Sequence, residues 1–200
     1  MQPVHVLLTG AIRIGKSTAL RRAVSLLGTT PGGFVTWFPD QDASYRQLLL
    51  GAVDGSDRGC VAAETKAGNP PQCHHAAFDT LGATLLREAS EKPLIVMDEC
   101  GRFEAGAMAF QREVLRCLEG DVPVLGVVRH LGQPSWLDSL TSHPNVEVVV
   151  VTQENRDRIP QWLVRHFAPL LAVHDVESAR TYSGPESADF LPSFAQNELK

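Results

Sequence analysis

The sequence predicts an α/β fold with three layers, in which helices cover both faces of a mostly parallel central sheet that has a small antiparallel edge. Two observations predict this architecture. Short apolar runs alternate with segments of helical spacing along most of the chain, and parallel strands need such crossover helices between them. Around residues 45–63, two strand-like segments follow each other with only a turn between them, which is typical of antiparallel pairing.

The individual elements are assigned from their periodicity and from turn residues. A short apolar run next to glycine favours a buried strand, whereas apolar positions three and four residues apart indicate a helix. The clearest helix runs from Lys16 to about Leu27, because Gly28 supplies a stop. The expected strands are residues 4–8, 32–38, 45–53, 59–63, 94–97, 122–128 and 146–151; the other expected helices are 76–91, 106–118, 135–141 and 160–171; residues 64–74 are expected to be an exposed loop.

Length and composition fit one globular domain. The 200 residues are 44% hydrophobic and 20% charged, close to the values of ordinary globular proteins, which argues against a disordered or fibrous chain. We expect residues 1–182 to form the domain. Residues 183–200 are expected to be a C-terminal tail, because the helical pattern fades and two prolines interrupt it.

Charge and cysteine content limit the partners. A net charge of −5 argues against a broad nucleic-acid interface, which needs a surplus of Lys and Arg on one face. No apolar run reaches the roughly 20 residues that cross a bilayer, and no secretory signal begins the sequence, so we expect no membrane contact and a cytoplasmic location. The four cysteines lack a C-x-x-C pair and are expected to be reduced, and Cys73-His74-His75 gives only a weak signal for metal. Nothing in the sequence identifies a protein partner.

Residues 10–17 carry the most specific signal. Gly10-Ala11-Ile12-Arg13-Ile14-Gly15-Lys16-Ser17 fits the G-x-x-x-x-G-K-S pattern of a phosphate-binding P-loop and lies between an expected strand and an expected helix. Backbone N–H groups of such a loop, continued by Thr18, point at phosphate oxygens, and the helix N-terminus adds a positive dipole end. We therefore expect Lys16 to contact the β- and γ-phosphates of a nucleoside triphosphate (NTP), and Ser17 to bind Mg²⁺.

Two adjacent carboxylates follow the apolar run 94–97. In a P-loop protein such an acidic strand end holds Mg²⁺, which we expect of Asp98. Glu99 is expected to orient or deprotonate the attacking water, a role that separates a hydrolase from a passive nucleotide binder. The alternatives are a turn or helix-capping role for Asp98 and plain surface charge for Glu99.

Four segments, taken in order, resemble a known family, the small P-loop nucleoside-triphosphatases of archaea, bacteria and animals. The segments are residues 10–17, Gly33-Phe34-Val35-Thr36, Asp98-Glu99-Cys100-Gly101-Arg102-Phe103-Glu104 and Val151-Thr152-Gln153-Glu154-Asn155-Arg156-Asp157. The resemblance covers about residues 4–165. It implies a P-loop NTPase fold and Mg²⁺-dependent hydrolysis of several NTPs to NDP and phosphate.

The resemblance also places Asn155, Arg156 and Asp157 near the base or the phosphates, although the same residues suit a helix cap. The family usually has a Pro-Gly pair inside its P-loop, whereas this chain has the extra cation Arg13, for which we favour a solvent-facing position. Arg129 and His130 follow an expected strand, where they are either γ-phosphate sensors or a solvated loop.

Two other functions are compatible with the motifs. A nucleoside or nucleotide kinase would use the same P-loop but would close an arginine-bearing lid, for which residues 54–75, with Arg58 and Lys66, are a sparse candidate. A nucleotide-dependent switch would hydrolyse little and act through a partner. Residues 155–158 lack the final Asp of a guanine-reading Asn-Lys-x-Asp motif.

Overall fold

The computed structural model describes residues 4–39, 44–56, 59–129 and 136–181, with side chains described as far as residue 172. The strands are β1 (His5–Thr9), β2 (Gly32–Trp37), β3 (Tyr45–Ala52), β4 (Cys60–Lys66), β5 (Gln72–Cys73), β6 (Ile95–Cys100), β7 (Val124–Val128) and β8 (Val146–Val150). The helices are α1 (Lys16–Leu27), α2 (His75–Ala77), α3 (Ala83–Glu88), α4 (Met108–Glu119), α5 (Trp136–Thr141) and α6 (Ile159–Thr181), with a π-helical turn, η1 (Phe78–Gly82), and a 3-10 turn, η2 (Ala89–Glu91).

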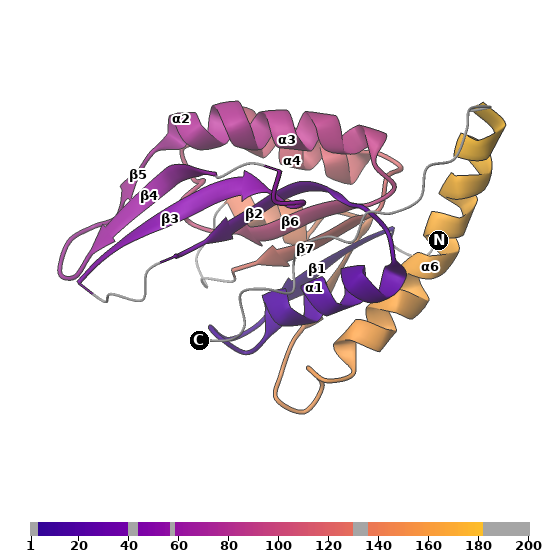
Figure 1. Ribbon diagram of the computed structural model, residues 1–200. Coiled ribbons are helices and arrows are strands. Elements are labelled where there is room, and N and C mark those ends of the chain that lie inside the picture. The colour runs from indigo at the N-terminus through magenta and orange to yellow at the C-terminus, as the bar shows by residue number, and fades with distance from the viewer. Residues whose placement is uncertain (1–3, 40–43, 57–58, 130–135, 182–200) are drawn as a thin grey trace.

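One eight-stranded sheet carries the fold, in the order β5-β4-β3-β2-β6-β7-β1-β8. Strands β2, β6, β7, β1 and β8 are parallel, and β3, β4 and β5 add an antiparallel edge. In Figure 1 the α3 and α4 layer covers one face and α1 and α6 cover the other. The predicted fold class, a three-layer P-loop NTPase fold with a mostly parallel sheet, is confirmed.

Two apolar clusters hold the layers together, one on each face of the sheet. On the α3 and α4 side, the rings of Phe34 and Phe110 meet edge to face at 5.1 Å and are fully buried. On the α1 and α6 side, Leu8 packs with Leu163 and Phe167. Burying one such side chain stabilises the fold by about 1.5–3 kcal/mol, so these contacts fix the helices that carry the site.

His5 connects three elements inside the core. The Val124 N–H donates to its Nδ1 at 3.1 Å, so Nε2 carries the proton and donates to the Leu118 carbonyl at 3.0 Å. Burial lowers the pKa of His5 from 6.5 to about 4, which keeps the ring neutral at physiological pH. The ring therefore links β1 to the end of α4 and the start of β7.

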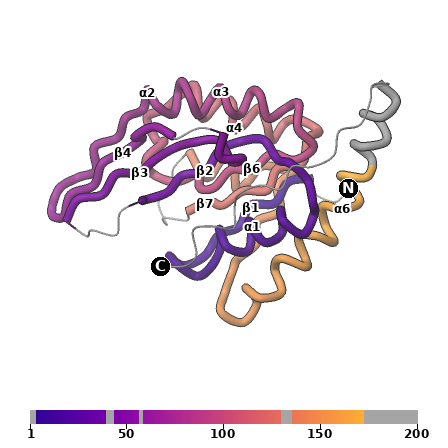
Figure 2. The backbone as a smooth tube through the Cα atoms, in the orientation of Figure 1, coloured from indigo at the N-terminus to yellow at the C-terminus, as the bar shows by residue number. Residues whose placement is uncertain are grey.

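Three expected elements differ from the observed ones. The loop prediction for residues 64–74 is wrong in part: β4 continues to Lys66 and β5 pairs with it, which satisfies backbone groups that a loop would leave to water. The expected helix 76–91 is divided by the π-helical turn, and α6 continues ten residues beyond the predicted end at residue 171. Figure 2 shows the β3–β4 hairpin projecting past the parallel part of the sheet. The expected tail, 183–200, lies outside the described residues.

The strand order positions the site. Strand β7 lies between β1, which leads into the P-loop, and β6, which carries the acidic pair. The carboxyl ends of these parallel strands meet at one edge, where ligands of α/β sheets bind.

Among the described residues, no helix combines the length and apolarity needed to traverse a membrane.

Candidate active site

The loop between β1 and α1 has the backbone conformation of a phosphate cradle. Gly10 has φ 138° and Gly15 has φ 109°, both in a region that side chains rarely adopt, and Arg13 has φ 61°. A Cβ on Gly10 would lie 2.5 Å from the Val151 carbonyl oxygen, so this position leaves no room for a side chain. Helix α1 begins at Lys16, so its free N–H groups face the loop.

Among the charged side chains of this loop, that of Lys16 is the most buried, with 7% of its surface exposed. Its Nζ donates to the carbonyl oxygens of Gly10 and Ala11, at 3.1 and 3.0 Å. The ammonium group is therefore held across the mouth of the loop by two neutral acceptors. The other loop residues present their side chains outward or partly so: Ala11, Ile12, Arg13 and Thr18 are exposed, and Ile14 is half-buried.

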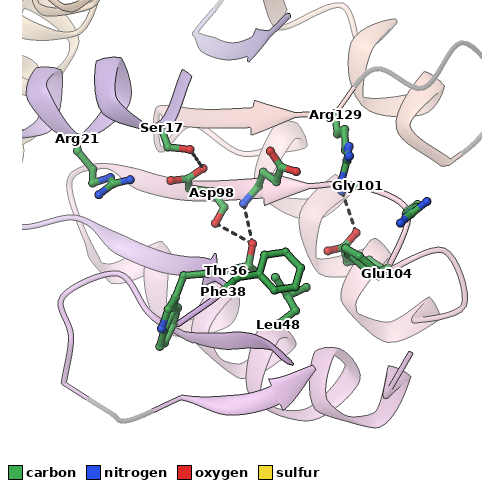
Figure 3. Close-up of a pocket in the computed structure, with 13 residues that line it drawn as sticks. Ser17, Arg21, Thr36, Phe38, Leu48, Asp98, Gly101, Glu104 and Arg129 are labelled. Carbon is green, nitrogen blue, oxygen red and sulfur yellow. Dashed lines mark hydrogen bonds between the residues drawn. The ribbon is translucent and has the colours of Figure 1, made fainter. Parts of the chain in front are cut away.

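Ser17 and Asp98 meet directly. The Ser17 hydroxyl donates to Asp98 Oδ1 at 2.7 Å (Figure 3). Burial raises the pKa of Asp98 to about 6, although the bond from Ser17 and the nearby Arg21 and Lys16 lower it. The predicted pair of metal ligands is thus brought together from two segments far apart in the sequence.

Thr36, on β2, anchors the backbone of the acidic pair. Its Oγ1 donates to the Asp98 carbonyl at 3.3 Å and accepts from the Glu99 N–H at 3.2 Å. Glu99 is half-buried and lines both hollows described below. Its carboxylate therefore has a fixed backbone and a solvent-accessible face beside the P-loop.

The chain after β6 is fixed on both sides of Gly101. The Gly101 N–H donates to Glu104 Oε2 at 2.8 Å, and Trp136 Nε1 donates to the Gly101 carbonyl at 3.0 Å. The Arg129 N–H donates to the Cys100 carbonyl at 2.9 Å. Burial raises the pKa of Glu104 to about 7, against the effect of the bond from Gly101. These contacts hold the segment that follows Glu99.

Two hollows adjoin the P-loop. The larger, of about 630 Å³, is lined by Ile12, Arg13 and Lys16 together with Arg46 of β3. The smaller, of about 300 Å³, extends from Ser17 and Asp98 to the loop after β6 (Figure 3). Both are also lined by Phe38, Glu99 and Arg129.

The loop after β8 has one anchoring residue and one residue near the P-loop. Asn155 Oδ1 accepts from the Thr152 N–H at 2.8 Å, and its Nδ2 donates to the Val150 carbonyl at 2.8 Å, which is a turn-holding role. A Cβ on Gly15 would lie 3.9 Å from Arg156 Cδ, so the Arg156 side chain passes over the P-loop. Asp157 is exposed.

A family model described as NTPase matches residues 5–164 of this sequence. The chain belongs to this family of nucleoside-triphosphatases. The family assignment confirms both the suspected resemblance and the prediction of an NTP-hydrolysing enzyme. Two relatives named nucleoside-triphosphatase THEP1 are similar along most of their length. That of Thermofilum pendens is 32% identical over 187 residues, covering 86% of this chain and all of the relative, and that of Methanosarcina barkeri is 28% identical, covering 82% and 97%.

Two solved structures share the fold of this NTPase. THEP1 from Aquifex aeolicus matches with a TM-score of 0.66 at 18% identity, over 82% of this chain and 98% of that one. A human cancer-related nucleoside triphosphatase matches with a TM-score of 0.64 at 24% identity, over 88% and 98%. The family architecture therefore extends over the region that contains every predicted site residue.

Several residues of the site were not assigned a role from the sequence. Thr36, Arg21 and Arg46 lie 19, 4 and 29 positions from Ser17 along the chain, and only the sheet order brings Thr36 and Arg46 to the pocket. The suggested lid, 54–75, contains strands β4 and β5, so these parts of it belong to the sheet. Arg58 and His130 lie outside the described residues, and within the described ranges no group of three or more His, Cys, Asp or Glu side chains is placed to hold a metal ion.

Proposed function

We propose that this NTPase hydrolyses NTP to NDP and phosphate in a Mg²⁺-dependent reaction with little preference for the base. The observation that carries the proposal is the convergence of Lys16, the Ser17–Asp98 pair and Glu99 on the two adjoining hollows at the carboxyl edge of the sheet, with Glu99 lining both. Hydrolysis of a phosphoanhydride requires a cation for the phosphates, hard oxygen ligands for a metal ion and a carboxylate for the attacking water.

The donor set fits Mg²⁺. The hydroxyl of Ser17 and the carboxylate of Asp98 are hard oxygen ligands, and they lie within hydrogen-bond distance of each other beside the P-loop. When bound, the metal would neutralise charge on the β- and γ-phosphates. The raised pKa of Asp98, caused by its burial, supports a site that is completed by a cation.

Lys16 and the loop amides bind the phosphates in this proposal. Lys16 Nζ is held by two neutral carbonyls rather than by a carboxylate, so a phosphate oxygen can replace these acceptors without breaking an ion pair. The backbone N–H groups around Gly15 and the start of α1 add fixed partial positive charge. This charge is oriented before the substrate arrives, so little reorganisation is needed.

Glu99 accepts the proton of the attacking water, or orients that water, in this proposal. Its backbone is fixed through Thr36, and its side chain lines the same hollow as Lys16. A half-buried carboxylate beside bound phosphates is suited to holding a water molecule for in-line attack. Broad base use is supported by Asn155, because both ends of its amide are engaged by backbone groups and neither is offered to a base.

The test is phosphate release from ATP, GTP, CTP and UTP, with and without Mg²⁺, on wild type, Lys16→Ala and Glu99→Gln. We expect release from all four NTPs, dependence on Mg²⁺, and losses in both variants of at least about a hundredfold. Lys66→Ala and Glu88→Gln change exposed residues of the same types and should keep full activity. Glu99→Gln should still bind NTP. Activity of Glu99→Gln equal to that of Glu88→Gln would remove Glu99 from the mechanism.

A further inference from the structure

We propose that the smaller hollow, which extends from Glu99 to the loop after β6, binds a phosphorylated acceptor of the nucleoside monophosphate class. We also propose that this NTPase can transfer the γ-phosphoryl group of NTP to that acceptor. The inference shares the P-loop and the NTP donor with the proposed hydrolysis but does not need water as the acceptor. Three observations carry it, namely space, unpaired positive charge and an aromatic wall.

The space is larger than hydrolysis requires. The two hollows share Phe38, Glu99 and Arg129, so they adjoin each other between the P-loop and the loop after β6. A water molecule takes about 30 Å³, whereas the smaller hollow alone measures about 300 Å³. The region next to Glu99 therefore has room for a second organic reactant.

Arginine side chains line this space in excess of the P-loop cations. Arg46 and Arg129 line the larger hollow, and Arg21, Arg102 and again Arg129 line the smaller one. None of them forms an ion pair within the described part of the chain, where the ion pairs join Arg87 and Arg116 to Glu113. Unpaired guanidinium groups are suited to phosphate, which they bind through two parallel hydrogen bonds.

The wall between the two hollows is built of alternating cations and rings. The Arg46 guanidinium lies 4.7 Å from the centre of the Phe38 ring, which meets Phe103 edge to face at 6.5 Å. Arg102 lies 5.1 Å from the centre of Phe103. A planar base can stack on such a surface while its phosphate contacts the arginines. The combination favours a nucleotide over an inorganic anion or a simple alcohol.

The chemistry of transfer balances without a base. A phosphate oxygen of the acceptor forms a bond to Pγ, the bond from Pγ to the β–γ bridging oxygen breaks, and the electron pair leaves with NDP. Total charge is equal on both sides when the acceptor phosphate is doubly ionised, so no proton has to be removed. Glu99 is therefore needed for attack by water and not for transfer.

The experiment measures the ratio of transfer to hydrolysis. ATP labelled at the γ-phosphate is incubated with Mg²⁺ and AMP, GMP, CMP or UMP, and labelled NDP is counted against labelled free phosphate. We expect labelled NDP with at least one monophosphate. Arg102→Gln should lower the ratio about tenfold or more, because Arg102 lines the smaller hollow, on the acceptor side of Glu99, and does not line the hollow beside the P-loop. Glu99→Gln should raise it by a similar factor.

Arg22→Gln is the matched control, since Arg22 is exposed on α1 and lines neither hollow. The inference is overturned if no monophosphate receives label while free phosphate is released, or if Arg102→Gln lowers the ratio no more than Arg22→Gln. Labelled NDP without release of free phosphate would instead overturn the hydrolysis proposal and support the transfer. The two proposals can therefore fail separately.

Discussion

The hydroxyl of Ser17 donates a 2.7 Å hydrogen bond to Oδ1 of Asp98, although strand β7 separates β1, which leads into the helix of Ser17, from β6, which carries Asp98. The bond connects the first turn of α1 with the end of the acidic strand. Two oxygen donors are thereby held together at a site where one of them, Asp98, is 6% exposed.

Replacement of Ser17 by alanine removes one of these donors. We expect Ser17→Ala to raise the Mg²⁺ concentration needed for half-maximal phosphate release on the order of tenfold or more, because the remaining carboxylate binds the cation alone. Ser25→Ala, at an exposed position of the same helix, should leave the Mg²⁺ curve unchanged. Coinciding Mg²⁺ titrations of the two variants would contradict a metal role for Ser17.

The loop after β8 allows stability and binding to be separated at adjacent positions. Asn155→Ala breaks two backbone contacts and should lower the free energy of unfolding by about 1–3 kcal/mol. Arg156→Ala should change stability by less than about 0.5 kcal/mol, because the side chain is exposed. The same change should weaken NTP binding, because Arg156 passes over Gly15. Denaturant unfolding and titration calorimetry on both variants test this; equal losses of stability would disprove it.

Two glycines with positive φ should respond unequally to alanine. Gly10→Ala brings a Cβ to 2.5 Å from the Val151 carbonyl and should cost about 3 kcal/mol or more. Gly28→Ala has φ 65° but open space around it, and should cost about 1 kcal/mol. Thermal unfolding of the two variants gives the comparison. A Gly10 variant as stable as the Gly28 variant would mean that the loop can move away from Val151.

Acid should weaken the fold through His5. The pKa of this ring falls from 6.5 in the unfolded chain to about 4 in the fold, so between these values the unfolded state binds more protons. The contribution of His5 is therefore complete above pH 6.5 and is lost as the pH falls through about 4. We expect the free energy of unfolding of wild type to exceed that of His5→Gln by about 1–3 kcal/mol near neutral pH. This difference should shrink as the pH falls. Unfolding at a series of pH values checks this; a constant difference would refute it.

The local sequence pattern was sufficient to predict the P-loop, the acidic strand end and most helices, because each of them depends on periodicity and turn residues within one segment. The partners of the acidic pair were not predictable in this way. Thr36 reaches Asp98 and Glu99 because β2 lies next to β6, and Arg46 reaches the hollow because β3 follows β2 at the antiparallel edge. Strand order depends on packing of the whole domain, and no short motif encodes it.

The two interpretations of Asn155 show, for a single residue, that local sequence pattern does not decide between roles that depend on the folded structure. The capping pattern and the resemblance both fitted residues 155–157, and the backbone contacts of Asn155 favour a structural role for that residue alone. Arg156 lies beside Gly15 of the P-loop, and its role near the base or the phosphates stays a prediction. The roles assigned to Lys16, Ser17, Asp98 and Glu99 stay predictions that depend on the kinetic tests above.

The position of β1 in the interior of the sheet also has a consequence for synthesis. Val6 pairs with Leu125 on one side and with Glu147 on the other, so β1 acquires its neighbours only after β7 and β8 have been synthesised. At about 5–20 residues per second, roughly 6–25 s pass between the synthesis of β1 and that of β7, which is the first of its two neighbours to be made. During that interval the nascent chain has an unpaired apolar strand and no formed phosphate cradle, so nucleotide can stabilise this enzyme only after translation has passed β8.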